Sequence, residues 1–396
     1  MGPDCSGPAT RRDHAGSQEM CNGRRKVQTM RVQISHCFAY YLPQFHVIPE
    51  NERWWGTGFT EWTRLKQAKQ FHPRQVILTP GELGWYSLDD PTIMERQYQL
   101  AREHSIDTFA FWHYWFDEGD LLLEKPAERL LKSDKEVEFC FSWANHDWLN
   151  RSKNEVLRQQ RYSKDSTAHF RYLEPFFHDR RYRKIDGRPV LLLFAPHSHP
   201  HLESYVDDMQ THAQRSGFPG MCLVFDNVRP KADLLSLCDW YLRSGIPLKF
   251  ERPVKRFLRK NLGALGGSEK PHIADYADCV SHMRRETPTN ERELPVAFPG
   301  WDTSIRHDAR GQILLGNSPE LFGHSLDAYQ QALSVRELRD RMMVIKSWNE
   351  WAEGNVMEPS AEFGRGHLKA FQQRFEILTD PAHRNLGTPS FAPAIL

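Results

Sequence analysis

The sequence has almost no net charge, because 52 Lys and Arg residues oppose 51 Asp and Glu residues and leave a formal charge of +1. It lacks the basic excess with which proteins bind nucleic acid or anionic membrane surfaces. No apolar stretch approaches the length of a membrane span, so none is predicted. Residues 1–30 also lack the apolar run of a signal peptide, which predicts a disordered leader and a cytoplasmic protein.

Cysteine is scarce and scattered. The seven Cys residues form no CxxC pair, which predicts reduced thiols and no disulfide framework. There is no Gly-rich dinucleotide fingerprint after the first predicted strand, no P-loop and no nucleophile elbow. No metal or organic cofactor is therefore implied. The cluster His197-Ser198-His199-Pro200-His201 leaves zinc as an alternative, although zinc hydrolases need ligands from other strands as well.

Short apolar segments alternate with amphipathic ones from residue 32 onward. The predicted strands are 33–41, 108–113, 138–143, 189–194, 221–225, 239–242, 295–298 and 342–346. The predicted helices are 90–104, 123–131, 165–178, 202–216, 231–236, 273–285, 326–340 and 362–378. Eight such units predict an α/β protein, a single (β/α)8 TIM barrel. A doubly wound open sheet is the competing architecture.

The predicted barrel occupies residues 31–380 and is followed by a C-terminal tail, 381–396. A long loop, 42–89, follows the first strand, and loops of that length are usually functional or disordered. This loop contains Trp-Trp-Gly at 54–56 and Gly-Phe-Thr-Glu-Trp at 58–62, a composition too aromatic for disorder. We expect it to form one wall of a substrate groove, with a plug over the barrel mouth as the alternative. A basic, Gly-containing excursion at 249–270 has no predicted role.

Eleven of the 12 Trp residues fall at or after the carboxyl ends of predicted strands. Barrel enzymes build their active sites at that face. Aromatic rings stack on the C–H faces of sugars, and interleaved polar groups bind the hydroxyls. The predicted substrate-binding residues are Tyr41, Gln44, Trp54, Trp55, Glu61, Trp62, His113, Tyr114, Trp143, Asn145, His146, Trp301, Asp302, Trp348, Asn349, Trp351 and Glu358.

The sharpest motif follows the eighth predicted strand and reads Trp-Asn-Glu-Trp-Ala-Glu-Gly from Trp348 to Gly354. On a helical turn, the Cβ atoms of Glu350 and Glu353 would lie roughly 5–6 Å apart. Two carboxyl groups that close do not both ionise readily, so one pKa should rise while the other stays low. That pairing suits glycoside chemistry, and the short separation favours retention of configuration. The alternative is an acidic helix N-terminus without a catalytic role.

Several motifs together resemble the WbsX-like proteins, glycosyltransferases of surface-polysaccharide gene clusters. More distantly the chain is similar to the endo-α-mannosidases of glycoside hydrolase family ninety-nine, which share a barrel. The matching motifs are Tyr40-Tyr41-Leu42-Pro43-Gln44-Phe45-His46, Trp54-Trp55-Gly56, Gly58-Phe59-Thr60-Glu61-Trp62, His113-Tyr114-Trp115-Phe116, Trp143-Ala144-Asn145, Gly187-Arg188-Pro189, Gly300-Trp301-Asp302 and the heptapeptide at 348–354.

The resemblance covers roughly residues 33–378. It implies that Glu353 protonates the leaving oxygen and that Glu350 assists attack by the sugar's own 2-hydroxyl, with net retention. His146 stands where the family pattern usually has Glu, and this departure falls at one expected substrate contact.

We therefore expect an enzyme that cleaves or transfers α-linked, mannoside-like units of a polysaccharide or glycan. A glycosyltransferase of surface-polysaccharide (O-antigen-like) biosynthesis is the first alternative, and a non-catalytic carbohydrate-binding protein is the second. The sequence predicts an oligosaccharide or polysaccharide partner and no particular oligomeric state.

Overall fold

The computed structural model describes residues 30–150, 153, 155–228, 232–245 and 270–378. Contacts divide the chain into residues 1–30 and a unit of residues 31–396, to which everything below refers. The predicted leader up to residue 29, the tail at 381–396 and all but the last residue of the basic excursion lie outside the described residues.

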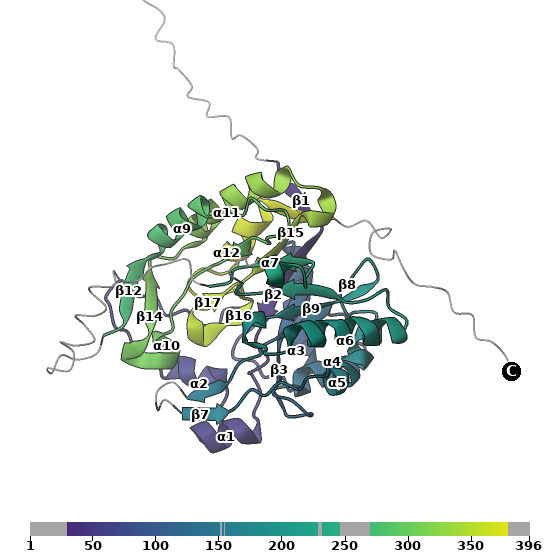
Figure 1. Ribbon diagram of the computed structural model, residues 1–396. Helices are drawn as coiled ribbons and strands as arrows, with labels where there is room; N and C mark the ends of the chain where they lie inside the picture. The colour runs from purple at the N-terminus through teal and green to yellow at the C-terminus, as the bar shows by residue number, and fades with distance from the viewer. Residues whose placement is uncertain (1–29, 151–152, 154, 229–231, 246–269, 379–396) are drawn as a thin grey trace, which may run out of the picture. The chain divides into compact units, whose positions relative to one another are not determined.

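A curled sheet of eight parallel strands forms the centre of the unit (Figure 1). All eight correspond to strands predicted from the sequence. They are β2 (His36–Tyr41), β3 (Thr108–Trp115), β5 (Phe139–Trp143), β9 (Arg188–Leu193), β10 (Cys222–Phe225), β11 (Trp240–Tyr241), β13 (Val296–Ala297) and β15 (Met342–Ile345). Short strands β4 (Leu121–Leu122) and β8 (Lys184–Ile185) pair antiparallel with β3 and β9.

The order of strands in the sheet is β11-β10-β9-β5-β3-β2-β15-β13, so nearly every strand pairs with its neighbour in the chain. The first strand of the series, β2, pairs in parallel with the last, β15. A parallel bridge joins Tyr241 in β11 to Glu293, three residues before β13. The two ends of the sheet path therefore approach one another.

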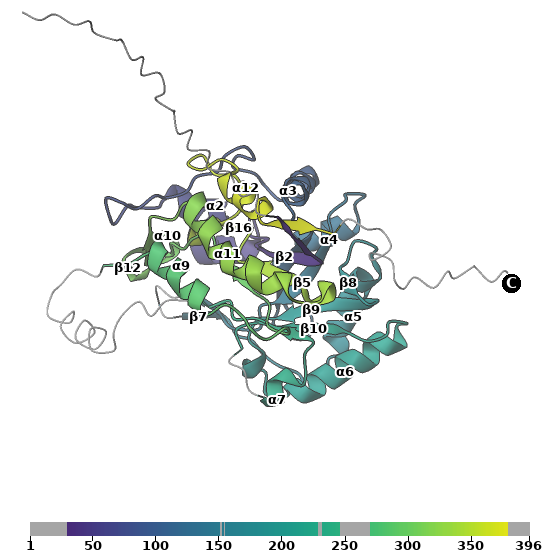
Figure 2. The same cartoon turned by 90° about the horizontal axis from the view of Figure 1, so that it is seen from above.

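Helices lie around the outside of these strands (Figure 2). They are α3 (Pro91–Glu103), α4 (Lys125–Leu131), α5 (Thr167–His178), α6 (Leu202–Arg215), α7 (Ala232–Leu235), α9 (Tyr276–Arg285), α11 (Pro319–Ser334) and α12 (Gly366–Gln372). Because helices and loops cover the sheet, a central strand such as β3 has all eight residues buried. The helix α3 begins as predicted, with Asp90 accepting a hydrogen bond from the Thr92 backbone N–H and Pro91 following at once.

Three predicted helices were wrong in part. The segment 273–285 begins as strand β12 (His272–Asp275), which pairs with β14 (Gln312–Leu315), and only its remainder is α9. The segment 362–378 ends in strand β18 (Phe375–Ile377), which pairs with β1 (Val32–Ile34). Both strands pair with segments far away in sequence, which local periodicity does not reveal. The third predicted helix, 326–340, corresponds to α11, which begins earlier, at Pro319, because Ser318 caps its N-terminus.

The loops at the carboxyl ends of the strands contain structure of their own. The segment 42–89 includes α1 (Pro49–Trp55) and α2 (Glu61–Lys66). Further short elements of these loops are hairpin strands β6 (Trp148–Asn150) and β7 (Glu155–Arg158), hairpin strands β16 (Asn349–Glu350) and β17 (Asn355–Val356), helix α10 (Ser304–His307), and the 3-10 turns η1 (Pro196–Ser198), η3 (Asp308–Arg310) and η5 (Trp351–Glu353). The 3-10 turn η4 (Leu338–Asp340) lies at the other end of the sheet, just before β15. Within the described ranges, no helix has the length and apolar character to cross a bilayer.

Candidate active site

A cleft of about 880 Å³ opens at the carboxyl ends of the sheet strands. The residues at 42, 114, 144, 194, 227 and 346 that line it lie near the carboxyl ends of six different strands or within two residues after them. The predicted site residues among its lining are Gln44, Trp55, Glu61, Tyr114, His146, Trp301, Glu350 and Glu353. The structure thus brings the predicted acid pair and part of the predicted aromatic wall into one cleft.

The acid pair lies on a hairpin rather than on the helical turn assumed from its spacing. Glu350 ends β16 and Glu353 ends the 3-10 turn η5. Glu350 is buried, and its Oε1 accepts a hydrogen bond from the indole N–H of Trp112 at 2.9 Å. Burial and the charge of Glu353 raise the pKa of Glu350, although Arg306 opposes the rise. One carboxyl group of the pair is therefore pushed toward its protonated form, as the motif predicted.

Arg306 connects three acidic side chains of the cleft. It lies on α10, which packs against both α2 and η5. Its guanidinium donates to Glu353 at 2.7 Å and to Glu350 at 3.3 Å, and it forms a short ion pair with Glu61. Because a guanidinium offers five N–H donors in one plane, a single arginine can serve three carboxylates at once.

A buried carboxyl group, that of Glu358, anchors the loop that carries Glu350 and Glu353. Glu358 accepts hydrogen bonds from the indole N–H groups of Trp348 at 2.8 Å and Trp351 at 2.6 Å. The hydroxyl of Tyr86 and the amide of Gln97 donate to the same carboxyl group at 3.0 and 2.5 Å. Burial raises the pKa of Glu358 to about 7, even though these four donors favour its charged form.

More than half of the predicted substrate-binding residues do not line the cleft. Most of them are hydrogen-bonded within the protein. Three donate to backbone carbonyl groups or to an amide, namely Trp62 to Tyr86, Trp143 to Trp115 and Tyr41 to Gln97. Asn349 and Asn145 each bond both backbone groups of one residue, Leu42 and Ala195 respectively, while Trp348 and Trp351 donate to Glu358, His113 pairs with His169, and Asp302 accepts from Gln75 and Ser304. Trp54 packs near Trp148, and Glu358 lies beneath the loop. These residues support the site from behind.

Sequence reasoning missed several cleft residues, above all Arg306 and Arg64. Neither belongs to a motif that carried the resemblance, although Arg64 follows Glu61 by one helical turn. Trp112 was expected at the end of a strand, but it lies inside β3 and was not assigned to Glu350. It stacks on Tyr40 with ring centroids 4.4 Å apart, which fixes its indole against the acid.

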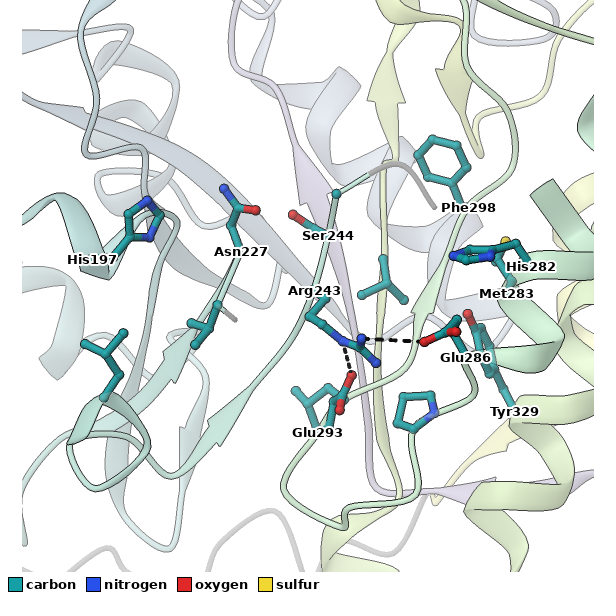
Figure 3. Close-up of a pocket in the computed structure, with 16 residues that line it drawn as sticks. His197, Asn227, Arg243, Ser244, His282, Met283, Glu286, Glu293, Phe298 and Tyr329 are labelled. Carbon is teal, nitrogen blue, oxygen red and sulfur yellow. Dashed lines mark hydrogen bonds and ion pairs between the residues drawn. The ribbon is translucent and has the colours of Figure 1, made fainter. Parts of the chain in front are cut away.

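A second cavity of about 690 Å³ adjoins the cleft and shares Asn227 with it. Figure 3 shows Arg243 between two carboxylates that line this cavity. Its Nε donates to Glu293 at 2.6 Å, and its Nη1 lies 4.0 Å from Glu286. None of the site residues predicted from the sequence lines this cavity.

Zinc, left open by the histidine cluster at 197–201, gains no support from the geometry. Across the described ranges, no three His, Cys, Asp or Glu side chains are grouped so that they could hold a metal ion. The ring of His199 instead packs among Trp143, Tyr162 and Tyr205.

Comparison with known proteins identifies the sequence family. The family described as Glycosyltransferase WbsX matches residues 37–371. Two curated relatives from strains of Xanthomonas campestris pv. campestris, both named Uncharacterized protein WxcX, are each 30% identical. The alignments cover 94% and 87% of this chain but 54% and 50% of the relatives. The chain therefore spans about half the length of these relatives.

Solved structures show similarity of fold alone. A protein titled Glycoside hydrolase-like protein superposes with a TM-score of 0.53 at 13% identity, over 87% of this chain and 96% of that chain. The GH99 endo-alpha-mannosidase from Bacteroides thetaiotaomicron gives a TM-score of 0.49 at 12% identity, over 86% of this chain and 97% of the other.

Proposed function

Because the chain belongs to the WbsX glycosyltransferase family, we propose that its cleft cleaves or transfers α-linked, mannoside-like units of a glycan, with Glu350 and Glu353 as the catalytic pair. We propose further that the eight strands form a closed (β/α)8 barrel. The bridge between Tyr241 and Glu293 supports closure, since it links the two ends of the sheet path.

The observation that carries this proposal is the position of the pair. Two carboxyl groups from one short hairpin line the same cleft, share one arginine, and differ in surroundings. A protonated acid beside an ionised one is the requirement for retaining glycoside cleavage. Trp55, Tyr114 and Trp301 in the same lining supply rings for stacking on sugars.

The family resemblance assigns proton donation to Glu353 and assistance of the 2-hydroxyl to Glu350. In the structure the raised pKa belongs to Glu350, while Arg306 donates to Glu353. Donation by Glu353 therefore requires a bound leaving-group oxygen to displace Arg306 from it. If Arg306 stays in place, Glu350 is the better donor.

The test compares Glu353→Gln and Glu350→Gln on a natural α-glycoside and on a glycosyl fluoride, whose leaving group needs no proton. We expect Glu353→Gln to abolish turnover of the glycoside and largely to spare the fluoride, while Glu350→Gln impairs both. The reverse pattern assigns the donor to Glu350. Unchanged turnover of the glycoside in both variants contradicts the proposal. Glycan binding without turnover, unaffected by Glu350→Gln, indicates a binding protein instead.

A second candidate is transfer from a sugar nucleotide during synthesis of a surface glycan. The cations Arg64, Arg306 and Lys346 line the same cleft as the acid pair and favour this candidate. A nucleoside diphosphate leaves as an anion and needs positive charge rather than a proton donor. Calorimetric titration with common sugar nucleotides tests this function, and failure to bind any of them counts against it.

A further inference from the structure

Arg64 is a cleft residue whose charge has no carboxylate partner of its own. It lies on α2, one turn after Glu61, and is half-buried. Its guanidinium carbon lies 4.5 Å from the ring centroid of Trp55 and 5.4 Å from that of Phe59. Among the described residues, no carboxylate lies within ion-pair distance of Arg64, and no oxygen accepts a hydrogen bond from it.

The acid nearest to Arg64 along the helix, Glu61, already has another partner. Glu61 is buried and forms an ion pair with Arg306. Burial lowers the pKa of Arg64, Glu61 raises it, Arg306 lowers it, and the more weakly acting Asp308 raises it. Arg64 and Arg306 are thus close enough to repel one another, and a partly desolvated cation in that position gains from an additional anion.

The geometry of Arg64 suits a planar or tetrahedral anion. A guanidinium over an aromatic face keeps its N–H donors in its own plane and free at its edge. Such an edge binds a carboxylate or a phosphate through two parallel hydrogen bonds. The edge belongs to a side chain that lines the cleft together with Glu350 and Glu353, so the anion would sit within reach of the reacting sugar.

We propose that the cleft recognises a sugar substrate bearing an anionic group, a carboxylate or a phosphate, and that Arg64 binds that group. This inference rests on the proposed function, because it names the class of substrate for the same cleft. A neutral glycan would leave the guanidinium edge facing only hydroxyl groups.

The test uses matched pairs of small ligands observed by saturation-transfer NMR at constant ionic strength. The methyl α-hexuronides of glucose, mannose and galactose are compared with the corresponding methyl α-hexosides, which differ only at carbon six. The hexose 1-phosphates are compared with the free hexoses. The first set reports carboxylate recognition and the second reports phosphate recognition.

We expect at least one anionic ligand to bind about tenfold more tightly than its neutral counterpart, as a charge-assisted pair of hydrogen bonds provides. Arg64→Met keeps an apolar chain over Trp55 and should remove that preference. Arg64→Lys keeps the charge without the planar edge and should retain part of it. Lys66→Met is the matched control, since Lys66 lies on the same helix, 5.0 Å from the ring of Trp85, and does not line the cleft.

Equal affinity within every pair, an unchanged preference in Arg64→Met, or no binding of any anionic ligand would overturn the inference. If Arg64→Met does not fold, the same comparison with Arg64→Lys decides. Because the experiment observes binding rather than turnover, the result does not depend on the catalytic roles of Glu350 and Glu353. Turnover of a neutral glycan with no anion preference would overturn this inference and leave the proposed function standing.

Discussion

At the scale of single residues, Arg306 compensates the negative charge of the acidic side chains in the cleft. It is the shared counterion of Glu61, Glu350 and Glu353, which come from two separate segments. Removing such a cation leaves a buried carboxylate such as Glu61 uncompensated, and that costs more than the ion pair itself contributes. The arginine therefore affects both folding and the protonation of the acid pair.

We predict that Arg306→Met lowers the free energy of unfolding by about 3 kcal/mol, as expected for a broken buried ion pair. The variant should also raise the pKa of Glu350 further, because Arg306 opposes that rise in the wild-type protein. Urea denaturation measures the first effect, and the pH profile of glycan turnover measures the second. Arg306→Lys keeps the charge but cannot reach three acids, so its free energy of unfolding should lie between those of wild type and Arg306→Met. A stability equal to wild type would contradict the role of Arg306.

A pair of buried histidines makes stability depend on pH. The Nε2 atoms of His113 and His169 lie 2.9 Å apart, and the Nδ1 atom of His169 lies 2.9 Å from the hydroxyl of Tyr205. Burial lowers the pKa of His113 to about 3 and places that of His169 well below its ordinary value. Both histidines are thus neutral in the folded protein and take up protons on unfolding.

Since the unfolded chain binds more protons below pH 6.5, the stabilisation by this pair is complete above that pH and is lost as the pH falls. We predict that His169→Gln reduces the slope of stability against pH between 6.5 and 5 by about 1 kcal/mol per pH unit, since one proton corresponds to about 1.4 kcal/mol per unit only when it is fully bound in the unfolded chain. Chemical denaturation across that range is the measurement. His324→Gln, at an exposed position, is the control and should keep the wild-type slope.

The sequence located the acid pair but not its surroundings. Glu350 and Glu353 stand in a dense motif directly after a strand, so their position at the cleft followed from the rule for barrel enzymes. Arg306 could not be found in the same way, because its role depends on α10 packing against α2 and η5. Conversely, Trp348 and Trp351 share the motif but point their indoles to buried Glu358.

At the scale of elements, α10 and the turn η5 pack closely against each other. The Asp302 backbone N–H donates to the Glu353 carbonyl at 2.6 Å. Gly354 follows Glu353 with φ of 56°, and a Cβ atom there would lie 2.8 Å from the Cβ of Asp302. Asp302 also accepts hydrogen bonds from Ser304 at the start of α10. The glycine therefore sets the distance between Arg306 and Glu353.

We predict that Gly354→Ala lowers both stability and turnover, since the added methyl group must displace Asp302 and with it α10. The strain of a positive φ alone costs about 1 kcal/mol, and the clash adds to that figure. Gly364→Ala is the matched control, because Gly364 has φ of 51° and open space around its Cα. Thermal unfolding and turnover are measured for both variants. Equal losses in the two variants would contradict the spacing role of Gly354.

Elements with strong local signals were predicted well. The eight sheet strands are short apolar runs, and a run of that kind favours a buried parallel strand. β12 and β18 were taken as helix, because their hydrophobic residues continue the spacing of the following or preceding helix and their partners β14 and β1 are far away in sequence. Long-range pairing decided these two elements.

At the scale of the whole molecule, ion pairs link the strands at the end of the sheet opposite the cleft. Arg183 precedes β9, donates to Asp107 at 2.9 Å and also pairs with Glu138, and these acids stand just before β3 and β5. Burial raises the pKa of Asp107, but Arg183 and His36 oppose it and bring the pKa down to about 2. Three neighbouring strands are tied together at their amino ends.

We predict that Arg183→Leu lowers the free energy of unfolding by about 3–5 kcal/mol, because Asp107 is left charged and buried. Turnover per folded molecule should stay near wild type, since the network and the cleft lie at opposite ends of the strands. Arg180→Leu removes an exposed pair with Glu136 and should leave stability close to that of wild type, because solvent screens such a pair. Unfolding by urea and kinetics at low temperature separate these effects. A selective loss of turnover in Arg183→Leu would contradict the assignment.

The pairing of β1 with β18 places the first and last described strands of the unit side by side, with Val32 opposite Phe375 and Ile34 opposite Ile377. The described part of the unit therefore begins and ends on adjacent strands. The unit is therefore suited to modular use: it can be spliced into a longer polypeptide at a single point, or circularly permuted by joining these ends, without a break near the cleft.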